Sequence, residues 1–300
     1  MMRFAIRRLG QGLLTLVGLS LLSFLLVVAV PGSYYDEARS DPRVSTETIR
    51  TMQARAGETG SLAQRYGQWL GSMVRGEGGY SIAYQTPVLP LILPRLRKTL
   101  ELAGVGLILT WLIVLALAAW AGRGSRVGIA VSNSMYAVLS AIPELVLACG
   151  LLALALHWGL LRENDIGLPA VVLGLSGIPG LLPPVRAALG KVSAAPHLLL
   201  AQVHGIRGWR YFSMFWLRAA SVSLISLAGV SVGTMLSSTL VVEIVCGWPG
   251  IGALFLQSIE SRDTHVVLAI VLVSSGVYSV ASTVSDLLVA AADPRIREGS

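Results

Sequence analysis

The most regular feature of the chain is a series of long apolar runs separated by polar stretches. A membrane-spanning helix needs roughly 20 mainly apolar residues, because it rises about 1.5 Å per residue across a hydrocarbon layer about 30 Å thick. Six runs meet this requirement, at residues 9–30, 99–122, 131–158, 168–189, 219–242 and 266–290. In lipid, runs of this length satisfy their backbone polar groups only as helices, so the pattern predicts an all-α protein with six transmembrane helices.

The composition agrees with a membrane protein. Hydrophobic residues make up 54% of the chain and charged residues only 13%, which excludes an ordinary soluble surface. The basic residues that give the net charge of +7 lie beside apolar runs and are not interleaved with aromatic residues, so they favour contact with a membrane surface over contact with nucleic acid. Cys149 and Cys246 lie far apart in the sequence, in or beside apolar runs, so we expect packing residues and neither a disulfide nor a metal site.

The N-terminal run is the one that could be mistaken for a signal peptide. It is longer than the apolar core of such a peptide, and no small-residue cleavage motif follows it. We therefore expect a retained first helix.

Basic residues predict the orientation. They gather at residues 3–8, 123–126, 186–218 and 295–297, whereas the short loops on the opposite side carry only Arg162 and Arg262. By the positive-inside rule both termini are cytoplasmic, as an even number of spans requires.

These spans divide the chain into four parts. Residues 1–30 form an N-terminal transmembrane helix, residues 31–98 an extracytoplasmic segment, residues 99–292 a five-helix core with a cytoplasmic loop at 190–217, and residues 293–300 a cytoplasmic tail. Within the extracytoplasmic segment, residues 64–74 place aromatic and apolar side chains at helical spacing, which predicts a short helix at the membrane interface. This helix either belongs to a structured connection or docks an external partner.

Two short motifs resemble catalytic or nucleotide sites. Residues 229–233 match G-x-S-x-G, with Ser231 as the candidate nucleophile, but they lie inside a span and no histidine is predicted at that depth. The same glycines match the spacing with which membrane helices pack closely, which is the interpretation we favour. Gly190 and Lys191 resemble the end of a phosphate-binding loop, but Val185 and Val192 break that pattern, so the chain holds no nucleotide by this motif.

The cytoplasmic loop before the fifth span is far longer than the loop between the second and third spans. Residues 196–206 begin with a proline, carry apolar residues at helical spacing and reach a glycine at Gly205. This pattern predicts a short amphipathic helix that either lies on lipid or enters a groove of a partner protein.

Glu144 follows Pro143 near the middle of the third predicted span. A carboxylate there is costly unless it faces a wet cavity or a partner, and the proline is expected to kink the helix. Glu144 is either a polar site in a translocation path that favours cationic cargo, or a protonated or hydrogen-bonded carboxyl between helices. The fourth span, with Pro179, Pro183 and Pro184, is a second place where irregular backbone could line a cavity.

Over nearly its whole length the sequence resembles the permeases of the dipeptide, oligopeptide and nickel ABC importers. The resemblance begins with the basic N-terminus and is most specific near the C-terminus. The matching residues there include Glu243, Pro249, Gly250, Gly252, Arg262, Asp263, Asp286, Asp293, Pro294 and Arg295.

The resemblance implies a type I ABC importer permease fold and a non-catalytic role. The long cytoplasmic loop would hold the coupling helix that docks on the ATPase, at positions Leu199, Leu200, Ala201, His204, Gly205 and Ile206. Only Ala201 and Gly205 match the family's E-A-A-x-x-x-G pattern, since Leu199 replaces the usual charged residue. Ser223 and Ser282 replace a usual proline and asparagine.

The same resemblance implies the partners and the location. We expect a second similar permease, two ATPase subunits that bind ATP and Mg, and an external solute-binding protein, all at the bacterial inner membrane. The chain itself would hold no cofactor and no metal. The cargo would be a small solute, with a di- or oligopeptide as the leading expectation and nickel or a metal chelate as the alternative.

Two functions of other classes are weighed against this one. A stand-alone secondary carrier often shows paired interrupted helices in two matching halves, and we see no internal repeat of that kind. An intramembrane serine protease would need a histidine beside Ser231. Co-purification of an ATPase subunit favours the importer, whereas ion-driven transport by the isolated chain favours the carrier.

Overall fold

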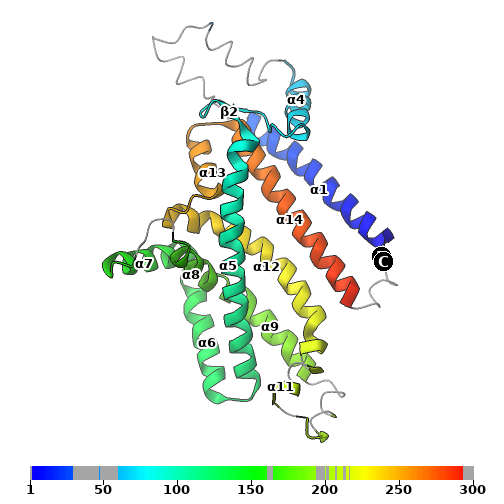
Figure 1. Cartoon of the computed structure of the whole chain (residues 1–300), viewed down its shortest axis with the longest axis vertical. Coiled ribbons are helices and arrows are strands. Elements are labelled where there is room, and N and C mark those ends of the chain that lie inside the picture. The colour runs from blue at the N-terminus through cyan, green and yellow to red at the C-terminus, as the bar shows by residue number, and fades with distance from the viewer. Residues whose placement is uncertain are drawn as a thin grey trace. The chain divides into compact units, whose positions relative to one another are not determined.

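The computed structural model of the protein (Figure 1) describes residues 2–29, 47, 60–160, 165–193, 200, 203–206, 208–211, 214–215 and 217–292. The main helices in this part of the chain are α1 (Met2–Ala29), α4 (Leu62–Val74), α5 (Val88–Gly122), α6 (Arg126–Ala141), α7 (Glu144–His157), α8 (Gly167–Ser176), α9 (Ile178–Ser193), α11 (Gly208–Tyr211), α12 (Leu217–Cys246), α13 (Ile251–Glu260) and α14 (Thr264–Ala292). Two short strands, β1 (Tyr80–Ser81) and β2 (Thr86–Pro87), form an antiparallel pair.

The six apolar runs correspond to helices, as the sequence predicts. Four helices (α1, α5, α12 and α14) are each long and apolar enough to cross a membrane. The third run consists of α6 and α7, which meet at a bend of 100°, and the fourth consists of α8 and α9, which meet at a bend of 51°. The kink expected at Pro143 is thus confirmed, and a second break separates Ser176 from Ile178.

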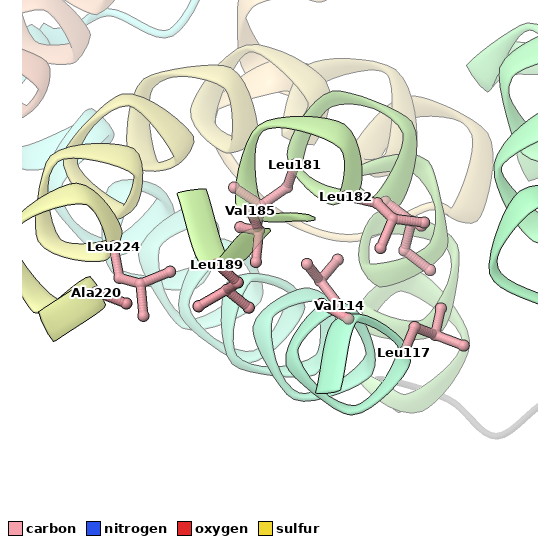
Figure 2. Close-up of a cluster of buried hydrophobic side chains, with 10 residues drawn as sticks. Val114, Leu117, Leu181, Leu182, Val185, Leu189, Ala220 and Leu224 are labelled. Carbon is pink, nitrogen blue, oxygen red and sulfur yellow. The ribbon is translucent and has the colours of Figure 1, made fainter. Parts of the chain in front are cut away.

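The chain divides into two compact units. The first contains Met1–Leu9, Glu101–Trp248 and Val280–Ser300. Its largest apolar cluster joins α5, α9 and α12, and Figure 2 shows Val114 and Leu117 of α5 facing Leu182, Val185 and Leu189 of α9. Partly buried residues of α6 pack against the same cluster, so four helices share one core.

A second cluster of the first unit joins the two broken helices to α12. Ala148 of α7, Leu173 of α8 and Val242 of α12 are all fully buried and belong to it, together with Leu102 of α5. The bent helices are therefore covered by packing within the unit along their inner faces.

Glycine allows α12 and α14 to approach closely. A Cβ atom built on Gly229 would overlap with the Oγ and Cβ atoms of Ser285, and the Ser285 hydroxyl donates a 3.1 Å hydrogen bond to the carbonyl oxygen of Ile225. The next residue of α14, Asp286, forms a 3.2 Å ion pair with Arg8. The helix-packing interpretation of Gly229 is confirmed.

The second unit contains Gly10–Leu100 and Pro249–Ser279. Its core joins the start of α5 to α13 and α14 through Val88, Ile92, Leu254 and Val266, all of them almost or fully buried. Helix α13 is not among the predicted helices, although Gly250, its N-cap residue, precedes a short apolar run there.

Helix α4 packs on α1 within the second unit and contains the helix predicted at 64–74. Ser61 and Gln64 form a reciprocal capping box at its start, which fixes where the helix begins. Trp69 is buried against Phe24 of α1, and the Tyr66 hydroxyl lies 2.8 Å from the Ser20 hydroxyl. The aromatic residues that the sequence places at helical spacing therefore form the side of α4 that contacts α1.

The close contact at Gly229 gives the first testable prediction. Gly229→Ala places a methyl group against Ser285, and overpacking of this kind costs about 1–3 kcal/mol of stability. Since a loss of 1 kcal/mol lowers the melting temperature of a chain of this size by about 2–4 °C, we expect a drop of several degrees in the apparent melting temperature of the purified protein in detergent.

The matched control is Gly276→Ala on α14, the helix that carries Ser285, where a new Cβ meets open space. This control should leave the melting temperature unchanged or raise it slightly. The double variant Gly229→Ala/Ser285→Gly should recover the loss. Equal melting temperatures for Gly229→Ala and the starting protein would contradict the packing argument.

Candidate functional site

The break between α6 and α7 follows from the residues at that point. Pro143 disfavours helical backbone in the residue before it, and Ile142 is accordingly extended, with φ −97° and ψ 117°. Pro143 serves as the N-cap of α7, and Glu144 is the first residue of that helix. The carboxyl group thus lies at a helix start, where free backbone N–H groups favour negative charge.

The break between α8 and α9 is closed by tight packing. The Thr110 hydroxyl of α5 lies 2.8 Å from the carbonyl oxygen of Gly174, and a Cβ on Gly177 would stand 2.9 Å from the same hydroxyl oxygen. Only glycine fits at this position without displacing its neighbours. Pro179, the second residue of α9, supplies no N–H to the first turn of that helix, where none is needed.

The two breaks and α12 supply a small polar cluster. The carboxyl group of Glu144 lies close to the hydroxyl groups of Ser176, the last residue of α8, and Ser238 of α12. Its Oε1 atom is buried and has no hydrogen-bond partner among the described residues. We call Glu144, Ser176 and Ser238 the break-point cluster.

The sequence marks Glu144 as a candidate site residue but marks neither serine of this cluster. Serine is common in membrane helices, so it carries little signal alone. The small residues just before Pro179 were the available hint that Ser176 lies at a break. No comparable hint marked Ser238, which the packing of α7, α8 and α12 brings to Glu144.

Of the expected coupling helix, the structure describes residues 200 and 203–206, with helical backbone at Leu200 and Val203 and a turn at His204 and Gly205. The backbone N–H of His204 donates a 3.0 Å hydrogen bond to the carbonyl oxygen of Leu200, as in an α-helix, and Gly205 then adopts a positive φ of 76°. Leu200 and Val203 are 57% and 83% exposed, so the turn presents apolar side chains outward. Ile206 is partly buried, and Leu199 and Ala201 lie outside the described residues.

The residues of the C-terminal motif occupy structural positions. In the first unit, Glu243 is fully buried on α12, and Asp286 pairs with Arg8. In the second unit, Pro249 and Gly250 precede α13, Gly252 is buried within it, and Arg262 follows it with a positive φ of 54°. Asp293, Pro294 and Arg295 lie outside the described residues.

Asp263 joins the short β-hairpin to the start of α14. Its fully buried carboxylate accepts hydrogen bonds at Oδ2 from the Ser81 hydroxyl (2.6 Å) and the Ala83 N–H (3.2 Å), and at Oδ1 from the Val266 N–H (3.4 Å). This one side chain therefore caps a membrane helix and holds a loop that lies far away in sequence.

Ser231 is not arranged as a nucleophile. Its hydroxyl donates to the carbonyl oxygen of Ala228 (2.8 Å) and lies 3.1 Å from the indole nitrogen of Trp111, which donates to it. Ser231 thus links α5 and α12. The described residues also contain no group of three or more His, Cys, Asp or Glu side chains that could hold a metal ion.

The arrangement matches a known family. The sequence pattern described as "Binding-protein-dependent transport system inner membrane component" matches residues 115–298, which is more than half of the chain. The chain belongs to this family. This permease is a multi-pass inner-membrane subunit of an ABC importer and carries out no covalent chemistry itself. Members of this family work with an ATPase and a solute-binding protein.

Several relatives are similar over almost their whole length. The oligopeptide transport system permease protein AppB of Bacillus subtilis is 29% identical over 99% of both chains. The dipeptide transport system permease protein DppB of Lactococcus lactis is 26% identical over 99% of the permease and 100% of that relative. The glutathione transport system permease protein GsiC of Escherichia coli is 28% identical over 99% of both.

A solved structure supports the fold. It is described as an amino acid ABC transporter with histidines, and it matches the permease with a TM-score of 0.53 at 17% sequence identity. The match covers 69% of the permease and 94% of that chain. The expectation of an all-α ABC importer permease fold is confirmed.

The Asp263 contacts give the second testable prediction. Asp263→Ala removes three hydrogen bonds and leaves the buried Ser81 hydroxyl without this acceptor, so we expect a loss of about 1–3 kcal/mol. The loss should appear as a lower apparent melting temperature and as faster proteolysis of the hairpin at residues 80–87.

Glu260→Ala, at an exposed position near the end of α13, is the control and should behave like the starting protein. Asp263→Asn should be intermediate, because an amide oxygen still accepts one of the bonds. Unchanged proteolysis in Asp263→Ala would show that Asp263 does not hold the hairpin.

Proposed function

We propose that the permease forms half of the path through which an ABC importer takes up di- or oligopeptides. The cargo follows from the relatives, because the three named above are an oligopeptide, a dipeptide and a glutathione permease, and the permease aligns with each over 99% of its length. Glutathione is itself a short peptide. The nickel alternative has no comparable support.

The proposed contact with the ATPase is the exposed turn around Leu200. Apolar side chains that point outward from a cytoplasmic loop are stabilised when they enter a groove on a partner. Leu199, Leu200, Ala201, His204, Gly205 and Ile206 would transmit closure of the ATPase pair, which binds ATP and Mg, to the helices that follow. These helices would then alternate between inward-facing and outward-facing states.

The proposed assembly contains a second, similar permease, two ATPase subunits and an external solute-binding protein. The path would lie between the two permeases. Both termini would face the cytoplasm, because the basic residues concentrate on their side of the membrane. The turn around Leu200, which we call the coupling turn, would lie on the same side. Residues 31–98 would lie on the opposite side and face the solute-binding protein.

The coupling turn gives the third testable prediction. Leu200→Ser combined with Val203→Ser removes the exposed apolar surface, so ATPase subunits should co-purify less and peptide uptake into proteoliposomes should fall by at least about tenfold. The measurement is uptake of a labelled tripeptide with the solute-binding protein outside and ATP inside.

The control for this variant is Val74→Ser, which makes the same change at an 84% exposed position at the end of α4. It should keep the same amount of co-purified ATPase as the unmodified permease. If the double variant retained full uptake, the ATPase would have to dock elsewhere. If no peptide entered with the unmodified permease, the peptide assignment itself would be wrong.

The orientation gives the fourth testable prediction. In a permease whose Cys149 and Cys246 are replaced by alanine, His204→Cys should react with a membrane-impermeant maleimide only in inverted vesicles, and Val74→Cys only in intact spheroplasts. His204 and Val74 are both exposed, so the side of the membrane on which each lies decides whether the maleimide reaches it. Labelling of His204→Cys from outside would reverse the proposed topology.

A further inference from the structure

We propose that the break-point cluster of Glu144, Ser176 and Ser238 binds the ammonium group of the cargo as it crosses the permease. This inference rests on the proposed function and adds to it the chemical group that the path recognises. Its basis is the convergence of two broken membrane helices on one partly buried carboxyl group, whose Oε1 atom is inaccessible to solvent.

The position of the cluster is unusual for a structural carboxyl group. Broken helices leave backbone groups outside the regular ladder, which is tolerated within a membrane only where protein covers them or where they line a cavity. Glu144 begins α7 directly after one break, and Ser176 ends α8 directly before the other. Helices α7, α8 and α12 pack on one another, so Ser238 reaches the same point.

The charge of the cluster is not balanced within the described part of the chain. Oε1 of Glu144 is buried without a hydrogen-bond partner, and no described Arg, Lys or His side chain forms an ion pair with it. A carboxylate within a membrane protein is costly unless it has a partner. A cation on the cargo would supply that partner during passage.

The oxygen atoms favour an ammonium group over a metal ion. An ammonium group has three N–H donors, and the cluster offers a carboxylate and two hydroxyl oxygens as acceptors. The hydroxyl of Ser176 donates to the carbonyl oxygen of Leu173 (3.0 Å), so its lone pairs remain available to accept. A divalent metal needs at least four ligands, and the described residues hold no group of three or more metal-binding side chains.

A peptide carries ammonium either at its N-terminus or on a lysine side chain. Three tripeptides separate these sources: trialanine, its N-acetyl form, and N-acetyl-Ala-Lys-Ala. Each would be supplied to proteoliposomes that contain the whole importer, with the solute-binding protein saturated by that peptide. Uptake would be normalised to the amount of assembled complex.

With Glu144→Gln, we expect uptake of trialanine to fall by at least about tenfold, because the charge partner of the ammonium group is lost, and uptake of N-acetyl-trialanine to stay unchanged. A fall for N-acetyl-Ala-Lys-Ala would show that a side-chain ammonium also binds, whereas no fall would limit the site to the N-terminus. Equal losses for all three peptides, or no loss for any, would overturn the proposal and indicate a hydrogen-bonded carboxyl with a structural role.

Two further variants keep the test decisive. Ser176→Ala and Ser238→Ala should each lower trialanine uptake more than N-acetyl-trialanine uptake, and they decide the outcome if Glu144→Gln does not assemble. Glu260→Gln makes the same chemical change at an exposed site and should have no effect. If the unmodified importer moved none of the peptides, the proposed function would fail, whereas a peptide-independent effect of Glu144→Gln would overturn the ammonium site alone.

Discussion

Backbone N–H and carbonyl groups that lie in lipid must find their hydrogen-bond partners within the protein, and the architecture of the permease follows from this constraint. Helices α1, α5, α12 and α14 meet it by running unbroken through long apolar segments. The two interrupted helices meet it by packing, since Thr110 reaches the end of α8 and α12 covers α7 and α8. Both interruptions belong to the first unit.

Association of these helices depends on small residues and a few polar contacts, because lipid tails are as apolar as leucine and no hydrophobic force drives helices together within the bilayer. Gly106 of α5 receives Leu173, and Gly174 of α8 receives Leu109, so the two helices interlock. Trp111 and Ser231 add a hydrogen bond between α5 and α12. The serine that resembles a nucleophile in the sequence therefore serves the packing of a transporter.

A permease that carries out no covalent chemistry acts through exposed side chains that can bind partner subunits and through polar groups that can bind the cargo. The first unit contains both kinds of feature: exposed apolar side chains at Leu200 and Val203, and a partly buried carboxyl at Glu144 whose Oε1 atom has no hydrogen-bond partner in the described structure. In the proposed mechanism the first transmits work from the ATPase and the second recognises the cargo. In the second unit, Asp263 fixes a loop to the start of α14.

The sequence by itself determined the class of the protein, the number of apolar segments, the kink at Pro143 and the helix at 64–74, because each depends on local length, periodicity or proline stereochemistry. It also marked Glu144 as a candidate site residue and Gly205 as the end of the short helix predicted at residues 196–206. Only the tertiary structure decided that Ser176 and Ser238 meet Glu144, that Asp263 holds Ser81, and that Gly229 makes room for Ser285. These pairings join residues distant along the chain, and such contacts are set by helix packing, which local sequence patterns do not encode.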